Sequence, residues 1–158
     1  MRFYTEQECT GWLADRNRQR PDVSPALLRH RIKYPTEPHR FFFAAHWVSS
    51  SLTYRAPALL WITEWGIWPS SENWHLYYKL RQSHCDHHLL GEMPGHLFLE
   101  YEVEELTSFL QLSMLNGWGG YLLTQSNYVN AFFSHDEYID FYSDQQKQLD
   151  DVAKALGK

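Results

Sequence analysis

Stretches of helical period and stretches of strand-like period alternate along this chain, and that alternation limits the folds it can adopt. Apolar residues three or four apart mark residues 103–117 as an amphipathic helix, ending at Asn116-Gly117. Residues 28–34 instead alternate apolar and basic side chains, with the two-residue period of a half-buried strand. The pattern predicts an α+β fold, with a mostly antiparallel sheet of about five strands packed against three to four helices.

The length and composition of the chain indicate one folded unit. Its 158 residues are close to the usual size of a domain and suffice to bury about 70% of the surface that the unfolded chain exposes. The hydrophobic fraction of 44% and the charged fraction of 21% are ordinary for a globular protein. We therefore expect residues 1–158 to form a single globular α+β domain.

Two sequence patterns are typical of a capping box at a helix start. Thr5 and Glu8 have the Thr-x-x-Glu spacing, which predicts a first helix over residues 5–17. Ser134 and Glu137 repeat that spacing and predict another helix near the C-terminus. The apolar face of this later helix is expected to carry Tyr138, Phe141, Tyr142, Leu149 and Val152.

The remaining elements are predicted from apolar runs and turn signals. Ser70 or Ser71 can cap a helix that runs to about residue 82. Further strands are expected at residues 40–48, 58–65 and 97–101, although residues 40–48 also fit a buried helix. A turn is expected at residues 91–95, and a hairpin joins residues 121–123 to 128–133 through Ser126-Asn127.

Charge is distributed unevenly along the chain. Residues 1–40 hold eight Lys or Arg against five Asp or Glu, whereas residues 82–146 hold ten acidic residues and no Lys or Arg. The acidic stretch is either a solvated surface that maintains solubility or a field that steers a basic partner. It argues against a nucleic-acid partner, which requires a basic stripe.

Histidines concentrate between residues 84 and 96, where they suggest a metal site. The candidate ligands are His84, His87, His88 and His96. Imidazole is a zinc ligand, but the spacing matches neither paired structural ligands nor an HExxH motif. We expect no cofactor, with zinc at these histidines as the alternative.

Other enzyme signals are few. Glu64 and Glu100 follow two predicted strands and could form an acid–base pair. Ser134, His135 and Asp136 have the residue types of a catalytic triad, but real triads assemble from distant segments. Neither GxSxG nor a phosphate-binding glycine motif is present in the sequence.

The expected location of the protein is the cytoplasm. No apolar run reaches the roughly 18 residues that a membrane span needs, and residues 1–20 lack the apolar core of a secretory signal. Cys9 and Cys85 are the only cysteines, and their number and spacing predict free thiols.

Two short segments carry a resemblance to a known group of proteins. They are Gly-Trp-Gly-Gly-Tyr at residues 117–121 and Phe-Phe-Ser-His-Asp-Glu-Tyr at residues 132–138. Together they resemble small bacterial immunity-type proteins, the antitoxins encoded beside toxins. The resemblance implies a small, acidic, cytosolic α+β domain that inhibits a toxin by occupying its active surface.

These observations favour a non-enzymatic protein that neutralises a basic partner, such as a toxin domain, through an acidic surface that carries aromatic residues. Trp68 and Trp118 lie beside turn signals, which makes them candidate surface anchors. The predicted partner-binding residues are Glu102, Glu104, Glu105, Trp118, Asp136, Glu137, Tyr138 and Asp140. The alternatives are a metal-dependent or carboxylate-based hydrolase and a structural or assembly subunit.

Overall fold

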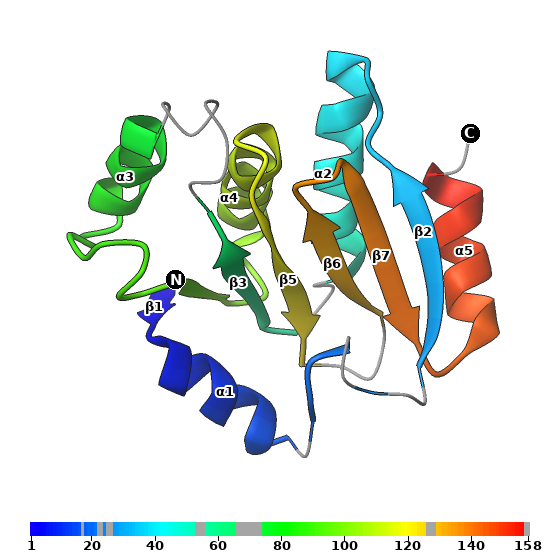
Figure 1. Cartoon of the computed structure of the whole chain (residues 1–158), viewed down its shortest axis with the longest axis horizontal. Helices are drawn as coiled ribbons and strands as arrows, with labels where there is room; N and C mark the ends of the chain where they lie inside the picture. Colours follow the sequence, from blue (N-terminus) through cyan, green and yellow to red (C-terminus); the bar gives the residue numbers. More distant parts are fainter. Residues whose placement is uncertain are drawn as a thin grey trace.

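The computed structural model describes residues 1–16, 18–21, 24, 27–52, 56–65, 74–125 and 129–156. Within these residues seven strands form one sheet in the order β1-β4-β3-β5-β6-β7-β2, and every neighbouring pair is antiparallel (Figure 1). The strands are β1 (Arg2–Tyr4), β2 (Leu28–Lys33), β3 (Ala58–Glu64), β4 (Gly95–Phe98), β5 (Gly119–Thr124), β6 (Asn130–Ser134) and β7 (Tyr138–Ser143).

Five helices accompany the sheet in the described part of the chain. They are α1 (Glu6–Ala14), α2 (Pro38–Leu52), α3 (Trp74–Ser83), α4 (Val103–Leu115) and α5 (Gln146–Leu156). The predicted α+β class is confirmed, with more strands and helices than the sequence indicated. None of these helices is long and apolar enough to cross a bilayer.

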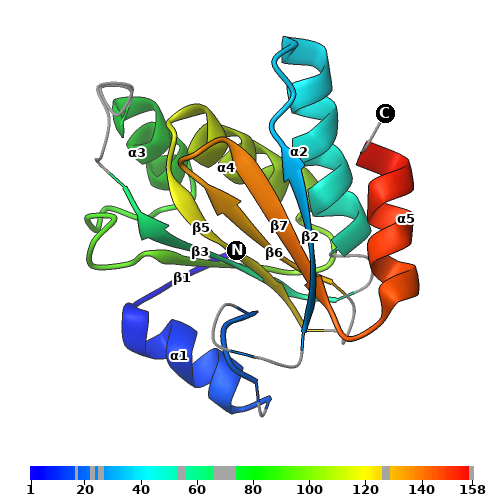
Figure 2. The same cartoon turned by 45° about the vertical axis from the view of Figure 1, so that its right-hand side comes forward.

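The helices cover the two faces of the sheet unequally. Side chains from α2, α3, α4 and α5 build the main core on one face, where they pack against Leu60, Leu122 and Phe141. Helix α1 lies on the opposite face and packs Cys9, Trp12 and Leu13 against β3, β4 and β5 (Figure 2). Burial raises the pKa of the Cys9 thiol to about 12, so this cysteine stays protonated at neutral pH.

Helix α1 begins where its capping box predicts. The Thr5 side chain accepts a hydrogen bond from the Glu8 backbone N–H, and the Thr5 backbone N–H donates to the Glu8 carboxylate. The helix ends at Ala14, three residues earlier than expected. The helix of residues 103–117 is confirmed as α4, and the strands of residues 28–34 and 58–65 as β2 and β3.

The strand expected at residues 40–48 is wrong, and the buried-helix alternative is correct. Helix α2 buries Ala44, Ala45, Val48, Ser49 and Leu52, which recur at the helical period. Pro38 occupies the first helical position, where its missing N–H costs nothing.

Two other elements are shifted from their expected places. Strand β4 spans Gly95–Phe98 instead of residues 97–101, because Leu99 already contacts the start of α4, donating its backbone N–H to Glu102. Helix α3 ends at Ser83, close to the prediction, while its expected caps, Ser70 and Ser71, lie outside the described residues, as do Trp68 and the Ser126-Asn127 turn.

The helix predicted from Ser134 and Glu137 is wrong in its first half. Residues 135–137 form the turn of a β-hairpin, and β7 follows it as a strand. Ile139 and Phe141 face the main core while Tyr138, Asp140 and Tyr142 alternate onto the other face, so the two-residue period decides the structure. Leu149 and Val152 belong to the separate helix α5.

Candidate functional site

The β6–β7 turn forms one end of the sheet together with the last residues of β2 and β3, the start of β5 and the C-terminal end of α4. The Ser134 hydroxyl accepts a hydrogen bond from the Asp136 backbone N–H at 3.1 Å, and Glu137 has a left-handed backbone with φ of 62°. The Tyr34 N–H donates to the Glu137 carbonyl at 2.8 Å, which ties the turn to the end of β2. Asp136 and Glu137 are both exposed on this turn.

His135 links the turn to Glu64, at the end of β3. Its Nδ1 lies 2.8 Å from Glu64 Oε2, and its Nε2 lies 3.5 Å from Asp136 Oδ1. A register shift between Ile62 and Glu64 brings Glu64 opposite Gly119. A Cβ atom at position 119 would lie 2.3 Å from Glu64 Oε2, so the glycine leaves the space that the carboxylate occupies.

A groove of about 710 Å³ opens between this turn and the helices α2 and α4. Its lining combines apolar and acidic side chains and contains no Lys or Arg among the described residues. The lining residues are Tyr34, Pro35, Thr36, Phe41, Met114, Leu115, Gly117, His135, Asp136 and Glu137. We call this feature, with Glu64 beside it, the acidic groove.

The end of α4 supplies one wall of the acidic groove. Gly117 adopts φ of 65°, and Trp118 N–H donates to the Ser113 carbonyl, which closes the helix with a Schellman turn. Leu115, just before this turn, keeps 57% of its side chain exposed. The wall therefore offers an apolar surface to a binding partner.

Tyr34 lines the same groove and carries a buried polar group. Its hydroxyl is buried and forms no hydrogen bond with the described residues. Burial, with a smaller effect from the Glu137 charge, raises the pKa of Tyr34 above its usual value, so the phenol is neutral and can donate a hydrogen bond. The hydroxyl has no surface open to the groove, so a ligand there does not contact it unless the side chain moves.

The predicted partner-binding residues do not form one surface. Asp136 and Glu137 border the acidic groove, whereas Glu102, Glu104 and Glu105 lie at the opposite end of α4. The helix has 13 residues and is about 20 Å long, which exceeds the range of unscreened attraction at physiological salt. The continuous acidic face expected from the sequence is therefore split into two regions.

Glu102 is engaged within the protein. Its carboxylate accepts a hydrogen bond from the Leu99 N–H at 2.8 Å and contacts the Met1 amino group. Burial raises the pKa of Glu102, but these two interactions outweigh it and lower the net pKa. Of the three glutamates, Glu104 is the exposed one.

The expectation that Trp118 is a surface anchor is wrong. Its side chain is 1% exposed and packs edge-on against Tyr77 and Trp74, with ring centroids 4.8 and 6.3 Å away. Large aromatic rings contribute most to burial, and the glycines around Trp118 let the chain turn it inward.

The expectation that Asp140 is exposed is also wrong. Asp140 lies in β7, is 2% exposed and accepts two hydrogen bonds from Arg31 at 2.7 and 2.8 Å. Arg29 approaches the same carboxylate to 3.8 Å. Tyr138 lies beside this pair and is half-buried.

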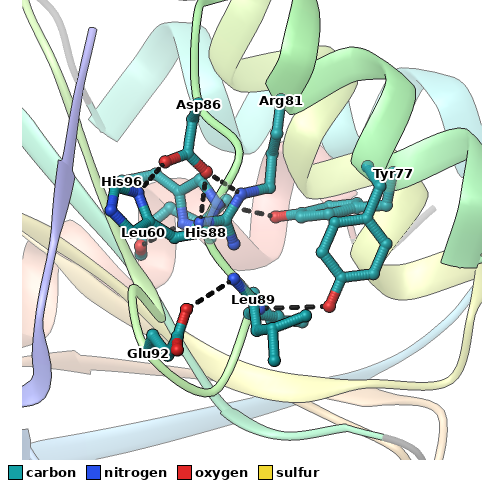
Figure 3. A network of polar contacts seen from close by, with 10 residues as sticks. Leu60, Tyr77, Arg81, Asp86, His88, Leu89, Glu92 and His96 are labelled. Atoms are coloured by element: carbon teal, nitrogen blue, oxygen red, sulfur yellow. Dashed lines mark hydrogen bonds and ion pairs between the residues drawn. The ribbon is translucent and has the colours of Figure 1, made fainter.

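The histidine-rich segment forms a structural network. Buried Arg81 of α3 pairs with Asp86 at 2.6 Å, and Asp86 also contacts His88 Nδ1 at 2.7 Å (Figure 3). His96 of β4 is fully buried, with the Tyr77 hydroxyl 3.3 Å from its Nε2. Within the described residues, no three His, Cys, Asp or Glu side chains are grouped to hold a metal ion.

The network changes the protonation of its members. Burial lowers the pKa of His96 to about 3, and the Arg81 charge adds to that effect. Burial alone would raise the pKa of Asp86, but hydrogen bonds from His88 and Arg81 lower it overall. At neutral pH the network holds a neutral His96 beside a charged Arg81–Asp86 pair.

The predicted pairing of Glu64 with Glu100 is wrong. Ala58, at the start of β3, pairs with Phe98, so Glu100 lies beyond that end of the strand and Glu64 at the other. Six residues of strand separate the two carboxylates by about 20 Å. The partner of Glu64 is His135, 71 residues away in sequence, and the paired glycines 119 and 120 were the one local sign of a close approach.

Comparisons with protein-family models, with curated proteins and with solved structures found no match. The function proposed for the protein therefore rests on the geometry of the acidic groove.

Proposed function

We propose that the protein binds a basic segment of another protein in the acidic groove and neutralises that partner in the manner of an immunity protein. The observation that carries this proposal is the composition of the groove. Two exposed carboxylates, Asp136 and Glu137, border an apolar wall, and none of the lining residues is a Lys or Arg. Such a surface is complementary to a cationic segment with an apolar side chain beside the charge.

The groove would contribute to binding in two ways. Its carboxylates attract and orient Lys or Arg side chains and so raise the association rate. Phe41 and Leu115 offer apolar surface on which a partner side chain would lose its water, and such central contacts carry most of the binding energy in protein interfaces.

The position of Glu64 and His135 fits the same role. His135 lies between the Glu64 and Asp136 carboxylates, and its contact with Glu64 holds the turn in place. Asp136 and Glu137 are thereby presented on a fixed turn, and a fixed surface loses less entropy on binding than a mobile one.

If the partner is a toxin, the protein would inhibit it by covering the surface that binds its substrate. Many basic surfaces on enzymes that act on nucleic acid attract phosphates, and an acidic protein that covers such a surface excludes the substrate. The partner would then be a cationic toxin domain, consistent with the resemblance to immunity-type proteins.

Peptide display tests the proposal without knowledge of the partner. A random library is selected on the wild-type protein and counter-selected on the Asp136→Asn/Glu137→Gln variant. We expect enrichment of peptides with Lys or Arg next to a large apolar residue. Calorimetry should show that this variant binds the enriched peptides about tenfold more weakly, or about 1.4 kcal/mol.

The matched control is Glu104→Gln/Glu105→Gln, which removes the same charge at the other end of α4. This variant should bind the peptides within about twofold of wild type, because its charges lie beyond the screening length. Equal losses in both variants would show attraction by net charge alone, and a library without basic enrichment would refute the proposal. In cells that produce both this protein and a toxin encoded by the neighbouring gene, growth is expected only when Asp136 and Glu137 are intact.

One observation favours a second function, a carboxylate-based hydrolase. The Glu64–His135 contact of 2.8 Å resembles an acid–base pair, and it lies beside a groove. Both ring nitrogens of His135 face carboxylates, however, which leaves neither clearly directed at a substrate. Hydrolysis of chromogenic esters or glycosides that is lost in His135→Gln would support this function over protein binding.

A further inference from the structure

One half of a sheet face has no helix over it in the described part of the chain. Helix α1 covers the half formed by β3, β4 and β5, whereas β6, β7 and β2 lie beyond it (Figure 2). We call this surface the open face and define it by Arg29, Arg31, Lys33, Phe132 and Tyr138.

Strand β2 contributes a row of three cations to the open face. Arg29, Arg31 and Lys33 alternate with His30 and Ile32, and Ile32 packs against the main core on the other side. All three cationic side chains are exposed. Alternate residues on a strand are about 7 Å apart, a spacing similar to that of successive phosphates in an extended nucleic-acid strand.

Aromatic rings from the neighbouring strands lie beside this row. The register places Lys33 opposite Tyr138 and Arg31 opposite Asp140, with Phe132 opposite Asp140 on the other side. The Phe132 and Tyr138 ring centroids are 6.3 Å apart, and the Phe132 and Tyr121 centroids are 5.0 Å apart. Phe132 and Tyr138 are half-buried and form a partly exposed aromatic surface, which ends at the buried Tyr121 ring.

Arg31 is held between the Asp140 carboxylate and the Tyr138 ring. Its guanidinium makes two hydrogen bonds to buried Asp140 and lies 3.5 Å from the centroid of the Tyr138 ring. Asp140 offsets one of the three positive charges, so the row retains two. The guanidinium therefore covers one face of the Tyr138 ring, and a planar group can stack on the side of the guanidinium that faces away from the ring.

We propose that the open face binds single-stranded nucleic acid, with Arg29 and Lys33 contacting phosphates and with Tyr138, Phe132 and Arg31 stacking on bases. Cations in a row beside aromatic rings are the combination that such ligands require. An acidic peptide would use the cations but not the planar rings, so it is the weaker candidate. The expectation of no nucleic-acid partner rested on the acidic second half of the chain, whereas β2 belongs to its basic first 40 residues.

Fluorescence anisotropy with labelled oligo-dT and oligo-rU of about 12 nucleotides tests this proposal. With two phosphate contacts, log affinity should fall with log salt with a slope of about −1.4, or about sevenfold between roughly 50 and 200 mM salt. The Arg29→Gln/Lys33→Gln variant should bind about tenfold more weakly at the lower salt and lose most of the slope. Both changed side chains are exposed, so the fold should be retained.

A second variant separates stacking from charge. Tyr138→Leu should weaken binding by about tenfold but keep the salt slope, because the phosphate contacts remain. Circular dichroism would establish that this variant is folded.

The matched control is Lys79→Gln/Lys147→Gln, which removes the same charge from exposed positions on α3 and α5. It should bind oligonucleotides as wild type does. The proposal is overturned if this control loses as much affinity as Arg29→Gln/Lys33→Gln, or if wild type shows no binding at the lower salt. Equal competition by a polyglutamate peptide would overturn it in favour of an acidic protein partner.

Discussion

The acidic groove and the open face share the β6–β7 hairpin, but its carboxylates are exposed in the groove and buried in the open face. The turn of the hairpin exposes Asp136 and Glu137, and neither contacts a Lys or Arg in the described residues. The strand that follows buries Asp140, which pairs with Arg31. A few residues of sequence thus separate an acidic surface from a basic one.

This difference shows that the charge of a segment does not fix the charge of a surface. Asp136 and Glu137 lie in the turn and border the groove, whereas Asp140 lies in β7 and points to the open face, because successive strand residues alternate between the two faces of a sheet. Arg31 comes from β2, 109 residues away from Asp140, and its row of cations outweighs that carboxylate. The comparison predicts that the two regions can be altered independently of each other.

The largest expected effect concerns a neighbouring pair of glycines beside the groove. A Cβ atom on Gly120 would lie 2.5 Å from the Trp61 carbonyl oxygen and 2.8 Å from the Phe133 ring. Because backbone and core must both move, Gly120→Ala should lower the free energy of unfolding by about 3 kcal/mol in urea denaturation.

Gly119→Ala is the matched variant for that measurement. Its new methyl group meets mainly the flexible Glu64 carboxylate, so the stability loss should stay below about 1 kcal/mol. The displaced Glu64 should nevertheless release His135 and weaken peptide binding in the acidic groove. Similar destabilisation by both variants would contradict the role assigned to Gly119.

The second largest effect is a loss of folding stability in acid. It limits the pH range in which binding to the acidic groove and to the open face can be measured. Unfolded histidine takes up a proton near pH 6.5, whereas burial holds the pKa of His96 at about 3 in the folded protein. Stability from this group is complete above pH 6.5 and is lost as the pH falls. At about pH 5 the loss should be about 2 kcal/mol, measured by denaturation at a series of pH values.

His96→Gln should flatten this pH dependence, because glutamine does not titrate. The control His87→Gln changes an exposed histidine and should retain the wild-type slope. An unchanged slope in His96→Gln would mean that another group controls the acid sensitivity.

A reciprocal pair of variants tests whether the acidic groove and the open face bind their ligands independently. Asp136→Asn/Glu137→Gln should weaken basic-peptide binding about tenfold and leave oligonucleotide affinity within about twofold. Arg29→Gln/Lys33→Gln should have the opposite pattern in the same titrations. If either variant changes both affinities by similar factors, the two regions form one electrostatic surface.

The smallest effect concerns α1, which covers the other half of the sheet face. Thr5→Ala removes the capping side chain and should cost about 1 kcal/mol of stability by thermal denaturation, with both binding affinities unchanged. Thr5→Ser keeps the hydroxyl and should be nearly neutral. A change in oligonucleotide binding would show that α1 belongs to the open face.

Local chemistry explains which parts of the fold could be predicted. The Thr5–Glu8 box, the alternation in β2 and the apolar stripe of α4 each depend on neighbours in sequence, and each was confirmed. Ser134–Glu137 has the residue types of a capping box, yet the packing of Ile139 and Phe141, two residues apart, against the main core favours a strand there instead. Local patterns cannot decide between two elements that they fit equally.

The site was harder to predict because its contacts join distant segments. Glu64 meets His135 across 71 residues, and no spacing in the sequence indicates that pairing. His88 and His96 were candidate metal ligands in the sequence, but His88 contacts Asp86 and His96 is buried among aromatic rings. Asp136 and Glu137 were predicted as partner-binding residues and stay a prediction, while the groove beside them was not predicted.

The place of β2 at the end of the strand order has a consequence for self-association. One side of its backbone has no strand beside it in the described chain, so its N–H and C=O groups could pair with the same strand of another molecule. Charged side chains along an edge strand oppose such pairing, because identical cations would be brought together. Removing Arg29 and Lys33 therefore withdraws a safeguard against sheet-to-sheet aggregation, and light scattering should accompany every measurement on that variant.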